Sequence, residues 1–251
     1  MAQSKPMPYE AFADNIRDAE TLLHYAIAFQ NERTRAMRSE LRKRIGEALR
    51  VPPSQREQLD CIQSRDVFVV FLPDGELNKE NFFDLRPLLR QSLVAACAAL
   101  ETYVADKALE FVGPALRADE LPPRMKGIQL TIGHWVDIER EYSRRGWGIR
   151  GIVEEHIRET SSTDPSQIGK VLSAVGVKDW LKRVDRHRKA KAGTTAAELT
   201  ELTSRRNRIA HFADRQGRGR AALTAEEVGR YLTTVKAVVE ATEDLLRDHY
   251  L

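Results

Sequence analysis

The clearest signal for the fold lies in residues 85–112, which read LRPLLRQSLVAACAALETYVADKALEFV. Apolar side chains recur there every three or four residues, a spacing that places them on one face of a helix. The recurring residues are Leu85, Leu88, Leu89, Ala96, Cys97, Leu100, Val104, Leu109 and Val112. Gly113-Pro114 follows, and both residue types commonly end helices. We therefore predict one long helix from about Leu85 to Val112, whose apolar face needs partners.

Shorter patterns downstream predict the helices that cover this face. Asp164-Pro165 reads as an N-cap followed by Pro in the first turn, and Thr224 to Glu227 reads as a capping box. The predicted helices are Arg124–Arg145, a shorter one from Gly146-Trp147-Gly148 to about Thr160, Ser166–Val175 ended by Gly176, a short one around Trp180, Ala196–His211, and a last one after Thr224. Residues 215–220 are expected to form a flexible loop. The fold class predicted is therefore an all-α helical bundle.

The first 80 residues have a less regular pattern. A helical period runs from Phe12 to about Leu49 with a polar break, and its charged second half suggests an exposed hairpin arm. The segment Val67–Leu72, VFVVFL, favours a single short strand near residues 66–72. We predict two parts, an N-terminal helical extension at residues 1–80 and a helical domain at residues 81–251.

Composition excludes several classes of protein. The chain has 251 residues, is 42% hydrophobic and 31% charged, and contains two cysteines. It can bury a core, whereas two cysteines are too few for a disulfide scaffold. The longest apolar runs are far shorter than the roughly 20 residues that span a bilayer, and the first ten residues lack the apolar core of a signal peptide. We expect a soluble cytoplasmic protein without membrane association.

Positive charge is concentrated in one segment. The formal net charge is +3, but residues 182–220 hold 12 basic and four acidic side chains, so this segment carries +8 and the rest of the chain −5. Such a segment is typical of a protein that binds a polyanion, and it is also compatible with a solvated basic helix face. Phe212 is the one aromatic residue within it.

Common catalytic motifs are absent from the sequence. None of the six histidines lies in HExxH or beside CxxC, and the chain has no GxSxG or Walker motif. Acidic residues do not cluster as they do in a two-metal nuclease. We therefore expect neither a bound metal nor a cofactor.

One hexapeptide stands out, Arg206-Asn207-Arg208-Ile209-Ala210-His211. On a helix Asn207 and His211 share a polar face, whereas Arg206 and His211 are about 140° apart, so they do not converge unless the helix distorts, the Arg reaches around, or a second chain completes the site. Arg206 falls within an apolar stripe and requires a partner, for which Glu101 is the candidate. The alternative interpretation is a structural Arg–Glu pair with a histidine at the helix C-terminus.

With this hexapeptide the sequence resembles the HEPN superfamily, whose ribonuclease members carry R-x(4–6)-H. The likeness covers about Leu85–Leu246. Residues 93–104, LVAACAALETYV, resemble the family's first helix with its acidic residue, and residues 164–184, DPSQIGKVLSAVGVKDWLKRV, resemble a region of RiboL-PSP-type HEPN domains.

The resemblance implies a HEPN-like bundle that acts as a metal-independent endoribonuclease, working as a homodimer with a composite active site. It implies a toxin or an anti-phage defence effector, with an antitoxin or another defence-system protein as a further partner. His211 would exchange protons with the RNA 2′-OH or the leaving 5′ oxygen, Arg206 would stabilise the phosphoryl charge, and Asn207 would orient the imidazole or contact the phosphate.

In the same scheme the RNA backbone would be held by Arg205, Arg208 and Arg215. The expected products are a 2′,3′-cyclic phosphate and a 5′-hydroxyl. Two alternatives remain open from the residues: a non-catalytic HEPN module that binds RNA, nucleotide or a partner protein, and a helical scaffold in which Arg206 has a structural role.

Overall fold

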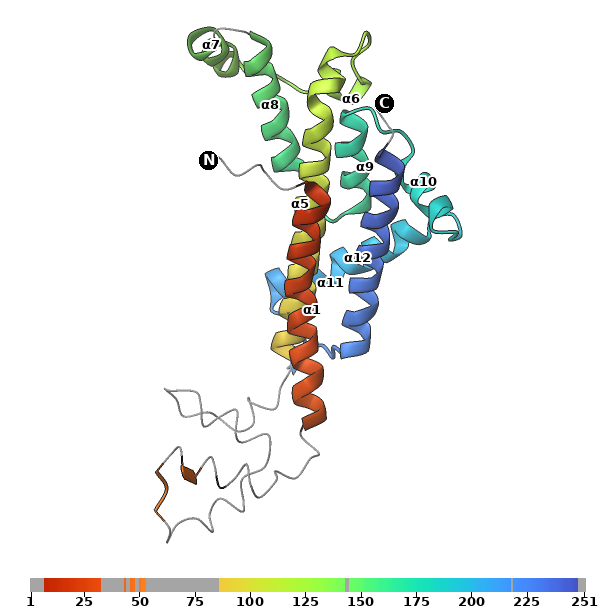
Figure 1. Ribbon diagram of the computed structural model, residues 1–251. Helices are drawn as coiled ribbons and strands as arrows, with labels where there is room; N and C mark the ends of the chain where they lie inside the picture. Colours follow the sequence, from red (N-terminus) through yellow and green to blue (C-terminus); the bar gives the residue numbers. More distant parts are fainter. Residues whose placement is uncertain are drawn as a thin grey trace.

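The computed structural model describes residues 7–32, 43, 46–47, 50–52, 86–142, 145–217 and 219–247. Their arrangement is an all-α bundle, as the sequence predicts, with one very small hairpin that the sequence analysis did not predict (Figure 1). The elements are α1 Pro8–Glu32, α5 Arg86–Arg117, α6 Pro123–Lys126, α7 Ile132–Glu141, α8 Arg145–Thr160, α9 Pro165–Ala174, α10 Trp180–His187, α11 Thr194–Phe212, β1 Arg215–Gln216, β2 Gly219–Arg220 and α12 Ala225–Leu246. The segment expected as a strand, 66–72, lies outside the described residues.

Helix α5 is the central element of the bundle. It contacts α1, α12, α8, α11 and α9, and 18 of its 32 residues are buried. The helix is therefore buried on more than the single apolar face that the sequence predicts. Small side chains such as Ala96, Ala99 and Ala108 are fully or almost fully buried and allow neighbouring helices to approach closely.

The predicted end of α5 at Gly113-Pro114 is wrong, because the helix continues to Arg117 with Pro114 inside it. A proline this close to the end of a helix removes only one backbone donor from the last turn. Val112 and Ala115 on either side have no exposed surface, so burial of the last turn against the bundle offsets the lost hydrogen bond.

Helix α1 belongs to the packed bundle. Figure 1 shows it lying along α5 and beside α12, and the pair α1–α5 has the most extensive contact between any two described elements. The Ser92 hydroxyl donates to the Ala19 carbonyl at 2.7 Å, and Lys236 Nζ lies 2.8 Å from a Glu20 carboxylate oxygen. Residues 8–32 are therefore part of the bundle, whereas most of the charged second half of this region, from which the exposed arm was predicted, lies outside the described residues. The division of the chain at residue 80 stays a prediction.

The helix predicted over Arg124–Arg145 is two helices, α6 and α7, separated by residues 127–131. Thr131 starts α7 with a capping box in which its hydroxyl accepts from the His134 N–H, and His134 Nδ1 accepts from the Thr131 N–H. The sequence reading missed this cap because histidine takes the place usually held by Glu or Gln.

Gly146 and Gly148 were predicted to separate two helices, but both lie in the first turn of α8. A Cβ on Gly148 would come within 2.7 Å of Ile138 Cγ1, so this glycine lets α7 pack closely on α8.

The remaining predicted helices are confirmed with small changes at their ends. Asp164 caps α9 by accepting from the N–H groups of Ser166 and Gln167, and Thr224 caps α12 by accepting from the Glu227 N–H. The expected loop at 215–220 instead contains the antiparallel pair β1–β2, with Gly217 at φ +59° in the turn. No helix in the described ranges is both long enough and apolar enough to cross a bilayer.

Candidate functional site

Helix α11 carries the Arg206–His211 hexapeptide, and both neighbouring helices fix its position. At its start Asp185 of α10 accepts from the backbone N–H groups of Gly193 at 2.7 Å and Thr195 at 2.9 Å. Burial favours the neutral form of Asp185, but the hydrogen bonds from Thr195 and Gly193, together with the charge of Arg188, outweigh it and lower its pKa. Asp185 therefore holds the first turn of α11 as an ionised cap.

A second connection joins the middle of α11 to α12. Glu201 accepts hydrogen bonds from Arg230 at 2.7 Å and from the Tyr231 hydroxyl at 2.8 Å. These two bonds lower the pKa of Glu201, and burial of Tyr231 together with the same carboxylate raises the pKa of the Tyr231 hydroxyl. Leu199 and Leu202 on the inner face are fully buried, so the register of α11 is fixed before the motif begins.

Arg206 lies beside the acidic residue that the sequence analysis assigned to it. Arg206 Nη2 is 3.7 Å from Glu101 Oε2 on α5, and Arg206 Nη1 donates to Asn207 Oδ1 at 3.1 Å. The side chains of Arg206 and Glu101 are 32% and 35% exposed, so the pair remains open to water and to a ligand. The structure thus brings together Arg206, Asn207 and Glu101.

His211 lies apart from this group, in the last turn of α11. The residue is exposed, and its ring centroid is 6.4 Å from that of Phe212, with the two planes at 71°. Within the described residues its imidazole forms no hydrogen bond or ion pair. The hydrogen bond of Asn207 goes to Arg206, so the expected pairing of Asn207 with the imidazole is not seen in the single chain.

The geometry narrows the three ways in which Arg206 and His211 could meet. Helix α11 is continuous from Thr194 to Phe212, so no distortion brings the two side chains together. The Arg206 side chain is directed to Glu101 and Asn207 rather than around the helix. Within the single chain Arg206 and His211 therefore do not meet.

Arg205 was expected to bind RNA, but the structure gives it a structural position. It is 5% exposed, its Nη2 lies 3.2 Å from Asp214 Oδ2, and the same nitrogen donates to the Ala222 carbonyl. A guanidinium buried in this way has no surface to offer a phosphate. The helical wheel placed Arg206 within the apolar stripe of α11, whereas the structure buries Arg205 and leaves the Arg206 side chain 32% exposed.

Asp214 is the residue that sequence reasoning missed. It is 1% exposed and accepts from Arg90 Nε of α5 at 3.1 Å in addition to contacting Arg205. Its backbone N–H donates to the Arg208 carbonyl, and its own carbonyl accepts from the Ala221 N–H. Asp214 therefore ties the C-terminal end of α11 and the hairpin to the central helix. The available signal was that Asp214 is the sole acid among residues 205–220.

The other predicted RNA contacts have accessible side chains. Arg208 on α11 and Arg215 on β1 are both exposed, and Arg220 on β2 is exposed beside Arg215 as its register partner. Phe212, 67% exposed, lies between these cations in the sequence.

Cys97 lies near the charged pair but is not placed to react. The thiol is completely buried on α5, and burial raises its pKa to about 12, an effect that Arg206 partly offsets and Glu101 strengthens. Such a thiol is protonated at neutral pH and poorly nucleophilic. In the described part of the chain, no three His, Cys, Asp or Glu side chains gather as a metal site would require.

Comparison with known protein families places this sequence in one of them. The model of the RiboL-PSP-HEPN family matches residues 74–248, a range that includes every helix from α5 to α12. No curated protein and no solved structure matches the chain. HEPN-type domains generally act as nucleases or as nucleotide-binding modules. Because the match spans well over half of the 251 residues and contains both α5 with Glu101 and α11 with the hexapeptide, the chain belongs to the RiboL-PSP-HEPN family.

Proposed function

We propose that this protein is a metal-independent endoribonuclease that acts as a homodimer. The observation that supports the proposal most strongly is at the end of α11. There Arg206 and Asn207, half-buried beside Glu101 of α5, and the exposed His211 lie on a segment with accessible cations. RNA contains its own nucleophile in the 2′-OH, so cleavage requires only proton transfer and stabilisation of charge.

In this mechanism the 2′ oxygen attacks the adjacent phosphorus and the bond to the 5′ oxygen breaks. His211 exchanges protons with the 2′-OH or with the leaving oxygen, and the guanidinium of Arg206 stabilises the charge that accumulates on the phosphoryl oxygens. Asn207 and Glu101 position that guanidinium. The products are a 2′,3′-cyclic phosphate and a 5′-hydroxyl.

A dimer accounts for the separation of Arg206 from His211. Two copies of α11 facing each other across a two-fold axis would bring the Arg206 of one protomer near the His211 of its partner. This arrangement predicts complementation between inactive variants. In an equal mixture of Arg206→Ala and His211→Ala chains, half of the dimers are mixed, and each mixed dimer has one intact composite site, so roughly a quarter of the wild-type activity returns. If both residues of a site came from one chain, no mixed dimer would be active.

Phe212 adds a surface on which an RNA base can stack beside the scissile phosphate. Its ring is exposed and adjacent to the His211 imidazole. Stacking of a base on an aromatic side chain contributes about 1–3 kcal/mol. Phe212→Ala in a His211→Ala background should weaken binding of a short oligoribonucleotide by that amount in fluorescence anisotropy, whereas Phe212→Trp should preserve it.

The direct test is a cleavage assay with mixed RNA in excess EDTA. The wild-type protein should cut, and both Arg206→Ala and His211→Ala should lose activity while eluting at the wild-type oligomeric size. The ends of the fragments should carry the 2′,3′-cyclic phosphate. Cleavage that depends on magnesium, or that survives both substitutions, would refute the mechanism.

The biological role proposed for this activity is that of a toxin or an anti-phage defence effector in the cytoplasm, restrained by an antitoxin or another defence-system protein. Expression in bacteria offers a simple check. Growth should be inhibited by the wild-type gene and restored by His211→Ala.

A second candidate is a non-catalytic HEPN module that binds RNA. It is favoured by the lack of contact between Arg206 and His211 within one chain, because a monomer would present the cations of α11 without a complete site. This alternative predicts RNA binding that weakens steeply with salt, without strand scission.

A further inference from the structure

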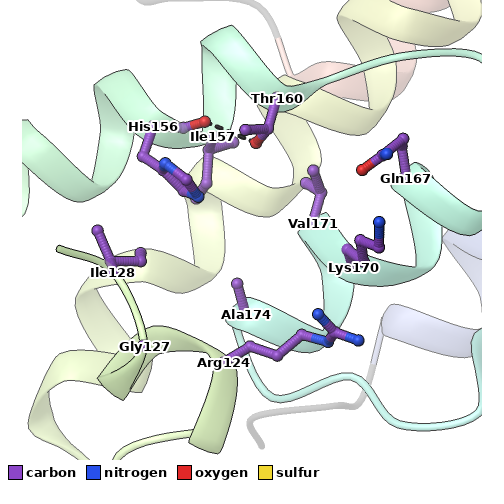
Figure 2. A pocket seen from close by; sticks show the side chains of 10 residues that line it. All are labelled: Arg124, Gly127, Ile128, His156, Ile157, Thr160, Gln167, Lys170, Val171 and Ala174. Carbon is purple, nitrogen blue, oxygen red and sulfur yellow. Dashed lines mark hydrogen bonds between the residues drawn. The ribbon is translucent and has the colours of Figure 1, made fainter.

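A pocket remote in sequence from the Arg206–His211 hexapeptide lies between α6, α8 and α9 (Figure 2). Its volume is about 300 Å³, at the lower end of the range of roughly 300–1,000 Å³ for small-molecule pockets. None of the residues discussed above for RNA cleavage lines it.

The charge of this pocket is one-sided. Arg124 of α6, His156 of α8 and Lys170 of α9 line it, and no Asp or Glu is among its ten lining residues. Within the described residues, none of these three side chains forms an ion pair or a hydrogen bond. Arg124 and Lys170 are thus cations without carboxylate partners in a concave surface, and they create a positive potential that attracts an anion.

Another hollow beside α8 is lined by acidic side chains instead. A second hollow of about 260 Å³ is lined by residues of α7 and α8 that include Asp137, Glu141 and Glu155. Glu155 and His156 are adjacent in the sequence and line different hollows. Acidic side chains are thus available on this part of the surface, but they line the other hollow.

The pocket also has an apolar wall. Ile157, Val171 and Ala174, which are 1%, 3% and 6% exposed, line it together with the partly buried Ile128. Figure 2 shows Arg124 and Lys170 extending from α6 and α9 on one side of the pocket and the His156 ring on the other side, near Ile128. A ligand seated here would contact cations with one end and aliphatic side chains with the other.

We propose that this pocket binds a phosphate group attached to an apolar or planar body. A phosphate carries enough negative charge to interact with both Arg124 and Lys170, and its oxygens accept hydrogen bonds from a guanidinium, an ammonium and an imidazole. The side-chain amide of Gln167, which also lines the pocket, supplies a further donor. The group comes either from a small phosphate ester or from the backbone of an RNA strand.

The test measures binding by the full-length protein with defined probes. Inorganic phosphate and phenyl phosphate are titrated calorimetrically at low ionic strength, and a labelled oligoribonucleotide without terminal phosphates is followed by anisotropy in a His211→Ala background. The pocket variant combines Arg124→Ala with Lys170→Ala. The matched control combines Arg158→Ala with Lys178→Ala, because these two exposed cations also belong to the region of α8 and α9 but do not line the pocket.

If the natural ligand is a small phosphate ester, phenyl phosphate should bind at least 10-fold more tightly than inorganic phosphate. The affinity for phenyl phosphate should then fall at least 10-fold in the pocket variant and less than 2-fold in the control. For an RNA strand as the source, the same contrast should appear with the oligoribonucleotide. Thermal melts establish that all variants are folded.

Equal losses in the pocket variant and the control, or no saturable binding of any probe, would overturn the proposal. Neither titration measures cleavage, so failure here and failure of the proposed ribonuclease activity are distinguishable.

Discussion

Asp214 offers the sharpest test of how the structure supports the end of α11. Substitution by Asn removes the negative charge and keeps the size of the side chain. It also suits the backbone, because Asp214 has φ +55° and Asn tolerates the left-handed region better than most residues. Any loss of stability therefore reports the charge rather than the shape.

The magnitude follows from what remains after the substitution. Arg90 and Arg205 have side chains 7% and 6% exposed, and Asp214 lies 3.1 Å and 3.2 Å from them. Removing one partner of a buried ion pair costs about 3–5 kcal/mol, because the remaining charge is left buried without compensation. Two guanidiniums lose their counter-charge here. We therefore expect Asp214→Asn to lower the free energy of unfolding by at least about 3 kcal/mol.

Urea unfolding followed by far-UV circular dichroism measures this loss. For a chain of this size each kcal/mol lowers Tm by roughly 2–4 °C, so Tm should fall by about 6 °C or more. Asp244→Asn is the matched control, since Asp244 is paired with Arg247 on the surface at 2.6 Å and both side chains are largely exposed. It should change stability by less than about 1 kcal/mol. A loss below 1 kcal/mol in Asp214→Asn, similar to the control, would refute the assigned role of the buried cluster.

Three further predictions concern the site and its supports. Arg206→Ala should lower the free energy of unfolding in urea by less than about 1 kcal/mol, because the pair of Arg206 with Glu101 is partly exposed. The same substitution should abolish RNA cleavage. A loss of stability near about 3 kcal/mol would indicate a structural role instead. Because the pKa values of Asp185 and Glu201 are lowered in the folded state, their contribution to stability is complete above the ordinary values of 3.8 and 4.5. This contribution is lost as the pH falls through their folded pKa values, so Tm should drop on acidification. The drop should be less steep in Asp185→Asn. Gly148→Ala should destabilise by about 1–3 kcal/mol, because its Cβ would overlap Ile138, and chymotrypsin should then cleave the α7–α8 region faster than in Gly169→Ala, where the added Cβ has open space.

Much of the fold could be read from local patterns. The period of apolar residues in 85–112 predicted the central helix, and the cap at Asp164-Pro165 predicted the start of α9, because both depend on residues within a few positions of each other. The reading failed where packing outweighs a local signal. Pro114 did not end α5, since the buried turn around it is stabilised by the rest of the bundle.

The residues of the candidate site could likewise be predicted only in part from the sequence. The sequence by itself determined the hexapeptide, its place on a helix, the candidacy of Glu101 as the partner of Arg206 and the family that the chain resembles. Only the tertiary structure decided that Arg205 is buried while its neighbour Arg206 is accessible, and that Asp214 neutralises Arg90 from 124 positions away. The physical reason is that periodicity records which side of a helix is apolar, whereas the partner of a buried charge is set by long-range packing that no local pattern encodes.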